Sequence, residues 1–305
     1  MKKLIFTILF FKLSLGFSQL VPIQSQYMFN GIALNPAFTG SEDAFSIVGS
    51  MRAQWLGFPG APTTQSLSAH APLKGMKSAI GLQVYADQIG VSKNTGIFGS
   101  YAYRLQVSKK SSLSFGVAGG VNLIKTNYSQ LQGNDPDDMA ALNDTPLGIL
   151  PDISLGMHYY TDKFFVNLSL PMFLSHRFDE MKFKIENNVR NYNVMLGAGY
   201  LFSFKNGIEL KPSFLGKYKA DSKMQFDFNL MSKFNEHFEM GLSYRTAEAL
   251  IALFKINVNQ QFSIMYSAGA PLNPILKQSF GSHELSLKYT FLYKTKITSP
   301  RFLGW

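Results

Sequence analysis

The feature that most constrains the fold of this chain is an alternation of apolar and polar residues with a period of two. In the stretch Glu284–Phe291, every second residue is apolar or aromatic and the residues between are mostly polar or charged. Ser112–Leu123, Met224–Leu230 and Phe238–Arg245 follow the same pattern. A period of two places successive side chains on opposite faces of a β-strand, and helical spacing fits none of these stretches.

About fourteen stretches of this kind follow residue 43. Most have a length comparable to the roughly 9–11 residues that a tilted strand needs to cross a bilayer. Two fit less well, because Pro212 interrupts one and Leu250–Phe254 is almost continuously apolar. The predicted strands span 44–53, 63–70, 79–86, 95–106, 112–123, 151–160, 163–170, 191–204, 207–217, 223–234, 237–245, 248–257, 260–269 and 281–292.

The links between these stretches differ in length in a regular way. The even-numbered links are mostly tight, whereas the odd-numbered links include the long segments 54–62, 124–150, 171–190 and 270–280. Short turns on one rim and long loops on the other are typical of outer-membrane barrels, whose short turns face the periplasm. Because lipid offers backbone groups no hydrogen-bond partners, strands that cross it must close into a barrel.

The sequence therefore predicts an all-β fold, a transmembrane antiparallel up-and-down β-barrel of about 14 strands over residues 44–292. The composition agrees, since only 16% of residues are charged yet the mean hydropathy is just +0.01, as expected when one strand face is apolar and the other polar. A secreted soluble β-sandwich, acting as an adhesin, is the alternative that alternation alone leaves open.

The N-terminus has the features of a secretory signal peptide. Lys2 and Lys3 precede the short apolar run Leu4–Phe11, and Gly16 and Ser18 supply the small residues before a cleavage site, so we predict a signal peptide over residues 1–18. The chain has no Cys, which excludes a lipoprotein anchor. At the other end, residues 293–305 are predicted to form a C-terminal periplasmic extension.

Residues 19–43 lie between the cleavage site and the first strand and do not alternate. Asn30-Gly31 and Asn35-Pro36 are turn signals in this segment. We expect it to begin in the periplasm, as an N-terminal lead-in that seals the first strand or as a plug that folds into the barrel; the sequence does not decide between them.

No pattern of catalytic or ligand-binding residues is present in the sequence. It contains neither a nucleophile elbow, a Walker A loop nor a zinc-protease motif, and its five histidines are far apart. We expect no enzymatic activity, no cofactor and no metal. The formal net charge of +10 is scattered along an exported chain, so we expect no nucleic-acid partner.

Seven stretches follow one another in order along nearly the whole mature chain. They are QYMFNGIALNPAFTGS (26–41), MRAQWLGFPGAPTTQSLSAHAPL (51–73), GLQVYADQIGVSKNTGIFGSYAYRL (81–105), PDISLGMHYYTDKFFVNLSLP (151–171), LKPSFLGKY (210–218), MGLSYR (240–245) and GSHELSLKY (281–289). Together they resemble the PorP/SprF family, the outer-membrane proteins of the type IX secretion system in the Bacteroidota.

The resemblance implies a non-enzymatic protein of the outer membrane that supports secretion of a large cargo protein or gliding adhesin. Its implied partners are periplasmic secretion and motor proteins, the secreted cargo and outer-membrane lipid. The alternative is a porin or a FadL-like hydrophobic-solute transporter. Candidate partner-binding residues come from the lead-in and from the rim segment 52–64, where aromatic and proline residues gather: Tyr27, Phe29, Asn30, Asn35, Pro36, Phe38, Trp55, Phe58 and Pro59.

Overall fold

The structure, a computed structural model, describes residues 23–130, 144–174, 176–179, 182–185, 192–220, 222–272 and 278–291. The predicted signal peptide (1–18) and C-terminal extension (293–305) lie outside these residues. Among the described residues, no helix combines the length and the apolar character that spanning a membrane requires.

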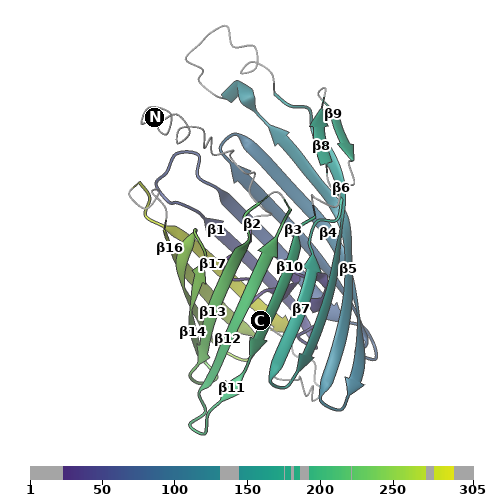
Figure 1. Cartoon of the computed structure of the whole chain (residues 1–305), viewed down its shortest axis with the longest axis vertical. Helices are drawn as coiled ribbons and strands as arrows, with labels where there is room; N and C mark the ends of the chain where they lie inside the picture. Colours follow the sequence, from purple (N-terminus) through teal and green to yellow (C-terminus); the bar gives the residue numbers. More distant parts are fainter. Residues whose placement is uncertain are drawn as a thin grey trace, which may run out of the picture.

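Fourteen long strands of the described chain form one closed antiparallel barrel (Figure 1). Each strand pairs with its neighbours along the chain, and pairing of the first strand with the last closes the ring. The strands are β1 (Phe45–Ala53), β2 (Thr63–Pro72), β3 (Ser78–Ile89), β4 (Ser92–Ser108), β5 (Ser111–Thr126), β6 (Gly148–Thr161), β7 (Phe164–Leu170), β10 (Val194–Tyr200), β12 (Glu209–Tyr218), β13 (Gln225–Lys233), β14 (Phe238–Arg245), β15 (Ala249–Asn257), β16 (Phe262–Pro271) and β17 (Ser282–Phe291).

Shorter elements complete the described chain. β11 (Phe202–Ser203) continues the line of β10, and β8 (His176–Asp179) pairs with β9 (Lys182–Ile185) in a separate hairpin. Three single 3₁₀ turns are η1 (Gly31–Ala33), η2 (Pro36–Phe38) and η3 (Tyr128–Gln130). Of these, η1 and η2 belong to the segment that precedes β1.

The two rims of the barrel differ as the sequence predicts. At one end, which we call the turn rim, the strands join through 73–77, 109–110, 162–163, 204–208, 234–237 and 258–261. The opposite end, the loop rim, carries the long links 54–62, 127–147, 171–193 and 272–281, together with three short links. β4, β5 and β6 extend beyond the predicted ends at the loop rim, and Figure 1 shows them rising as a taller wall on one side of the barrel.

Every predicted strand corresponds to one long strand of the barrel, so the predicted fold is confirmed. The single strand predicted over 191–204 differs from the structure in one detail: there it is interrupted, and its two parts are β10 and β11. The break lies opposite Pro212 in the β12 register, where Gly199 pairs with Ser213 and Phe202 with Leu210. Proline has no N–H to donate to the ladder, which accounts for the interruption.

The outward face of the barrel is apolar and the inward face holds most of the buried polar groups. Leu285 and Leu287 of β17 are about half exposed, whereas Glu284 and Ser286 between them are each only 2% exposed. The inward face is not uniformly polar, however. Leu215, Leu253, Met195 and Met265 are almost completely buried inside, so one side of the lumen is a packed apolar core rather than a channel wall.

Candidate functional site

The candidate site is built on residues Ile23–Ala44, which we call the lumenal segment. It runs through the barrel from the loop rim, where Ile23 lies, to the turn rim, where β1 begins. The turn signals of the sequence form its two 3₁₀ turns. Asn35 caps η2, since its side-chain Oδ1 accepts a hydrogen bond from the Ala37 N–H at 2.8 Å, and Pro36 occupies the first position of the turn.

The direction of this segment differs from our expectation that the lead-in begins at the periplasmic end. Instead, its first described residues lie at the loop rim. Arg52 Nη1 donates to the Ile23 carbonyl at 2.6 Å, and the Ser25 N–H donates to Glu284 Oε2 at 2.7 Å. Because Arg52 and Glu284 lie at the loop-rim ends of β1 and β17, these contacts fix where the segment enters the lumen.

Near the loop-rim ends of β12, β13 and β14, the segment packs beside a buried cluster of charges. Asp227 is fully buried and pairs with Lys217 Nζ and with Arg245 Nη2, both at 3.1 Å. Tyr27 is also buried, and its hydroxyl accepts a hydrogen bond from the Asn229 amide at 2.8 Å. Separating such a buried ion pair is costly, because it leaves a buried charge uncompensated. The cluster therefore fixes the positions of β12, β13 and β14 relative to one another around the segment.

Two facing glycines allow the segment to lie directly against the wall. Gly116 of β5 pairs across the ladder with Gly156 of β6, and both point inward. A Cβ at Gly116 would lie 2.2 Å from the Ala37 nitrogen, and one at Gly156 would lie 1.8 Å from Asn35 Oδ1. Only glycine leaves room for the η2 backbone beside Gly116 and for the Asn35 side chain beside Gly156.

Hydrogen bonds to the wall hold the segment at the same level. The Asn35 amide donates to the carbonyls of Met157 at 3.3 Å and Leu168 at 3.1 Å. The Ser114 hydroxyl donates to the Ala37 carbonyl at 2.8 Å. The irregular backbone of η2 thus obtains from strands β5, β6 and β7 the partners that buried polar groups require.

Ion pairs tie the last residues of the segment to the turn rim. Arg104 Nη1 pairs with Asp43 Oδ1 at 2.7 Å, and its Nη2 donates to the Gly40 carbonyl at 2.8 Å. Lys288 of β17 pairs with Glu42. Burial acts to raise the pKa of the Glu42 carboxyl, but the attraction and hydrogen bond of Lys288, together with the effects of His70 and Lys255, outweigh it, so the pKa lies below its ordinary value.

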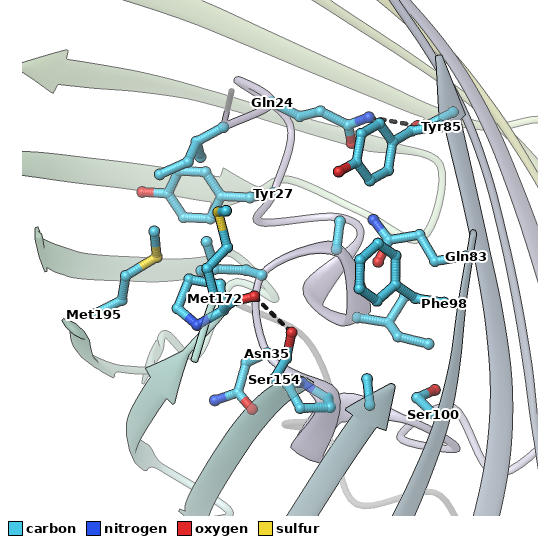
Figure 2. A pocket seen from close by; sticks show the side chains of 18 of the residues that line it. Gln24, Tyr27, Asn35, Gln83, Tyr85, Phe98, Ser100, Ser154, Met172 and Met195 are labelled. Atoms are coloured by element: carbon cyan, nitrogen blue, oxygen red, sulfur yellow. Dashed lines mark hydrogen bonds between the residues drawn. The ribbon is translucent and has the colours of Figure 1, made fainter. Parts of the chain in front are cut away.

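A cavity of about 100 Å³ lies between the lumenal segment and the wall (Figure 2). Its lining residues come from the segment, from β2 to β6, from the link after β7 and from β10. None of the described residues that line it is charged, and the side chains include both aromatic and amide groups. The sequence pattern does not reveal this cavity, because its residues are spread over most of the chain.

The nine candidate partner-binding residues fall into two groups in the structure. Tyr27, Asn30, Asn35, Pro36 and Phe38 are buried within the barrel, where their contacts are to this chain's own wall. Phe29 is half-buried, and Lys255 Nζ lies 5.6 Å from its ring centroid.

The other three candidates lie in the loop-rim link 54–62. Phe58 and Pro59 are exposed and Trp55 is half-buried. The link is braced by a neighbouring loop, since the Leu56 N–H donates to the Gly281 carbonyl at 2.7 Å and the Phe280 N–H donates to the Leu56 carbonyl at 2.8 Å. Phe280, which sequence reasoning missed, is 81% exposed beside them.

Sequence reasoning also missed the residues that hold the segment. Arg52, Arg104 and Glu284 occupy inward positions of alternating strands, where small and uncharged polar residues are common. A charged residue at an inward position of a strand that lies beside the lumenal segment is therefore the sequence signal that could have identified these residues.

Comparison with known proteins supports the fold. The barrel is similar to the CymD monoaromatic hydrocarbon channel, with 16% sequence identity, a TM-score of 0.50, and coverage of 92% of this chain and 96% of that one. It also resembles the outer membrane protein Omp33 of Acinetobacter baumannii, at 9% identity with a TM-score of 0.49, covering 83% of this chain and 100% of that one. The toluene transporter TbuX of Ralstonia pickettii matches at 10% identity with a TM-score of 0.49, over 91% of this chain and 96% of that one.

Sequence comparison identifies the family. No curated protein matches the chain. The family described as type IX secretion system membrane protein PorP/SprF matches residues 16–289, which is nearly the entire length. The chain therefore belongs to the PorP/SprF family of type IX secretion system membrane proteins.

Proposed function

We propose that this protein is a non-enzymatic outer-membrane component of the type IX secretion and gliding machinery. It supports the secretion or surface anchoring of one cargo protein and contacts periplasmic motor components. The observation that carries this proposal, within the family, is the course of the lumenal segment. It occupies the lumen from rim to rim, held at the loop rim by hydrogen bonds to Arg52 and Glu284 and at the turn rim by ion pairs. The barrel therefore offers docking surfaces at its rims rather than a conduit.

The two rims have different roles in this proposal. The exposed aromatic and proline residues of the loop rim, Phe58, Pro59 and Phe280, supply apolar contact area for the cargo outside the cell. The turn rim faces the periplasm in barrels of this kind and would meet the motor proteins. Phe234, which is exposed in the turn-rim link 234–237, is the corresponding apolar side chain there.

The test is affinity purification of the tagged protein from native envelopes in mild detergent. We expect periplasmic secretion components and one large exported protein to copurify. The double variant Phe58→Ala/Phe280→Ala should lose the exported protein and keep the periplasmic components, and Phe234→Ala serves as the matched turn-rim variant. Absence of both classes of partner from the wild-type sample would refute the proposal.

The alternatives of a porin or a FadL-like hydrophobic-solute transporter require a path through the barrel. CymD is a monoaromatic hydrocarbon channel and TbuX a toluene transporter. At such low sequence identity, the likeness to them concerns the fold and gives no information about what this chain transports. Single-channel recording in planar bilayers separates these functions. We expect no steady ionic conductance from the wild-type protein, and an open, stable pore would favour the porin.

A further inference from the structure

The cavity beside the lumenal segment has the size and chemistry of a small-molecule site. Its volume is about 100 Å³. An apolar protein cavity of roughly 150 Å³ accommodates benzene, so this smaller cavity admits at most one ring. Because none of its described lining residues is charged, an ion would lose its hydration without gaining a counter-charge. The ligand must therefore be neutral and small.

One wall of the cavity is a preformed aromatic surface. The rings of Tyr85 and Phe98 are almost parallel, with an interplanar angle of 5° and 6.3 Å between their centroids. Gly96 pairs with Tyr85 across β3 and β4, and a Cβ there would lie 2.3 Å from the Tyr85 ring. The missing side chain lets the Tyr85 ring lie against β4, and the Tyr85 hydroxyl donates to Asn122 Oδ1 at 2.5 Å.

The opposite wall is aliphatic and is made partly by the lumenal segment. Ile32, Leu34 and Pro36 of that segment line the cavity. Met172 and Met195 line it from the barrel side, as Figure 2 shows. Thioether side chains adapt to an aromatic guest and make favourable sulfur–ring contacts. A ring bound here would touch the aromatic wall and the aliphatic wall at once.

Of the four amide side chains that line the cavity, the one of Gln83 is available for a polar contact with a ligand, because those of Gln24, Asn35 and Asn122 are hydrogen-bonded to other residues. Gln83 of β3 lies beside the Phe98 ring, and its side chain makes no hydrogen bond to any other residue that the structure describes (Figure 2). An amide can donate and accept, so it suits one hydroxyl on an otherwise apolar ring. Small-molecule sites commonly combine a mostly apolar lining with a few polar groups of this kind.

We propose that this lumenal cavity binds a neutral molecule of one aromatic ring that carries a single polar group. The ligand would bridge the lumenal segment and the β3–β5 wall. This site is separate from the rim surfaces to which we assign cargo and motor contacts, so a failure of either proposal leaves the other standing.

The test measures binding of p-cresol to the full-length protein in dimyristoylphosphatidylcholine nanodiscs, by equilibrium dialysis against empty nanodiscs. We expect saturable binding with one p-cresol per protein. Ala118→Phe places a ring in the cavity from β5 and should weaken binding at least tenfold. Val117→Phe, the next residue on the same strand, points outward to lipid and should leave binding unchanged.

Folding of each variant is checked by heat-modifiable gel mobility, and Ala118→Leu replaces Ala118→Phe if the latter does not fold. Gln83→Leu should weaken p-cresol binding and spare toluene, which has no hydroxyl. Absence of saturable binding above the empty nanodiscs would overturn the proposal. Equal binding by wild type and the folded cavity-filling variant, or equal loss in Val117→Phe, would also overturn it.

Discussion

Replacing Gly116 with alanine should release the lumenal segment from the barrel wall. The added Cβ would lie 2.2 Å from both the Ala37 nitrogen and the Pro36 carbonyl carbon. Non-bonded heavy atoms prefer about 3.5–4.0 Å, so η2 must move away by more than about 1 Å. Neither atom belongs to a flexible side chain, and no change of rotamer relieves the contact.

The cost follows from the hydrogen bonds that this movement breaks. The Asn35 amide bonds to two wall carbonyls, and the Ser114 hydroxyl bonds to the Ala37 carbonyl. At a net value of about 1 kcal/mol each, losing these three bonds weakens docking of the segment by about 3 kcal/mol. That is roughly a hundredfold shift in the docking equilibrium. Alanine costs β5 itself nothing, since glycine is unfavourable within a strand.

The assay uses the absence of natural cysteines. Ala37 is 2% exposed, so an Ala37→Cys protein should react slowly with a water-soluble maleimide. Adding Gly116→Ala should raise the labelling rate by about the same hundredfold. Gly119→Ala is the matched control on the same strand, because a Cβ there meets nothing within 4 Å. Equal labelling rates in the two double variants would refute the reasoning.

Three further predictions follow from the faces and charges of the barrel. By denaturant titration, Leu287→Arg on the lipid face should lower the free energy of unfolding by about 2–4 kcal/mol near the midplane. Leu287→Met, which keeps an apolar side chain toward the lipid, should cost far less. Asp227→Ala should cost about 3–5 kcal/mol because it removes the carboxylate between the buried cations Lys217 and Arg245. Glu239→Ala, on a partly exposed pair, should cost at most about 1 kcal/mol. The carboxylate of Glu42, whose pKa is lowered by folding, stabilises the fold at any pH above the pKa of the unfolded carboxyl, and this contribution is lost as the pH falls through the folded pKa. In thermal melts, the difference in melting temperature between wild type and Glu42→Gln should therefore shrink in acid. A constant difference would contradict this assignment.

The strands were predictable because their signal is local. Alternation needs only a short window of sequence, and the lengths of the links identify the two rims. Even the broken ladder at Pro212 has a local cause. The ends of β4, β5 and β6 were not predictable, since nothing in their sequence marks where the lipid stops.

The course of the lumenal segment was not predictable for the opposite reason. Its contacts join residues far apart in the chain, such as Ser25 and Glu284, which are 259 positions apart. Its aromatic, asparagine and proline residues are the same types that a docking loop presents to a partner. Burial of Tyr27 and Phe38 against the barrel's own wall therefore cannot be told from the composition of the segment.

The stretch Leu250–Phe254, which alternates poorly, reports on the interior of the barrel. It forms part of β15, in which Leu250 and Phe254 face lipid while Ile251 and Leu253 are buried in the core around the lumenal segment. A strand beside a water-filled lumen would need polar residues at the inward positions. A strand with apolar residues on both faces is stable where protein fills the lumen beside it. The interrupted alternation of Leu250–Phe254 is therefore itself a sequence signal of a plugged barrel.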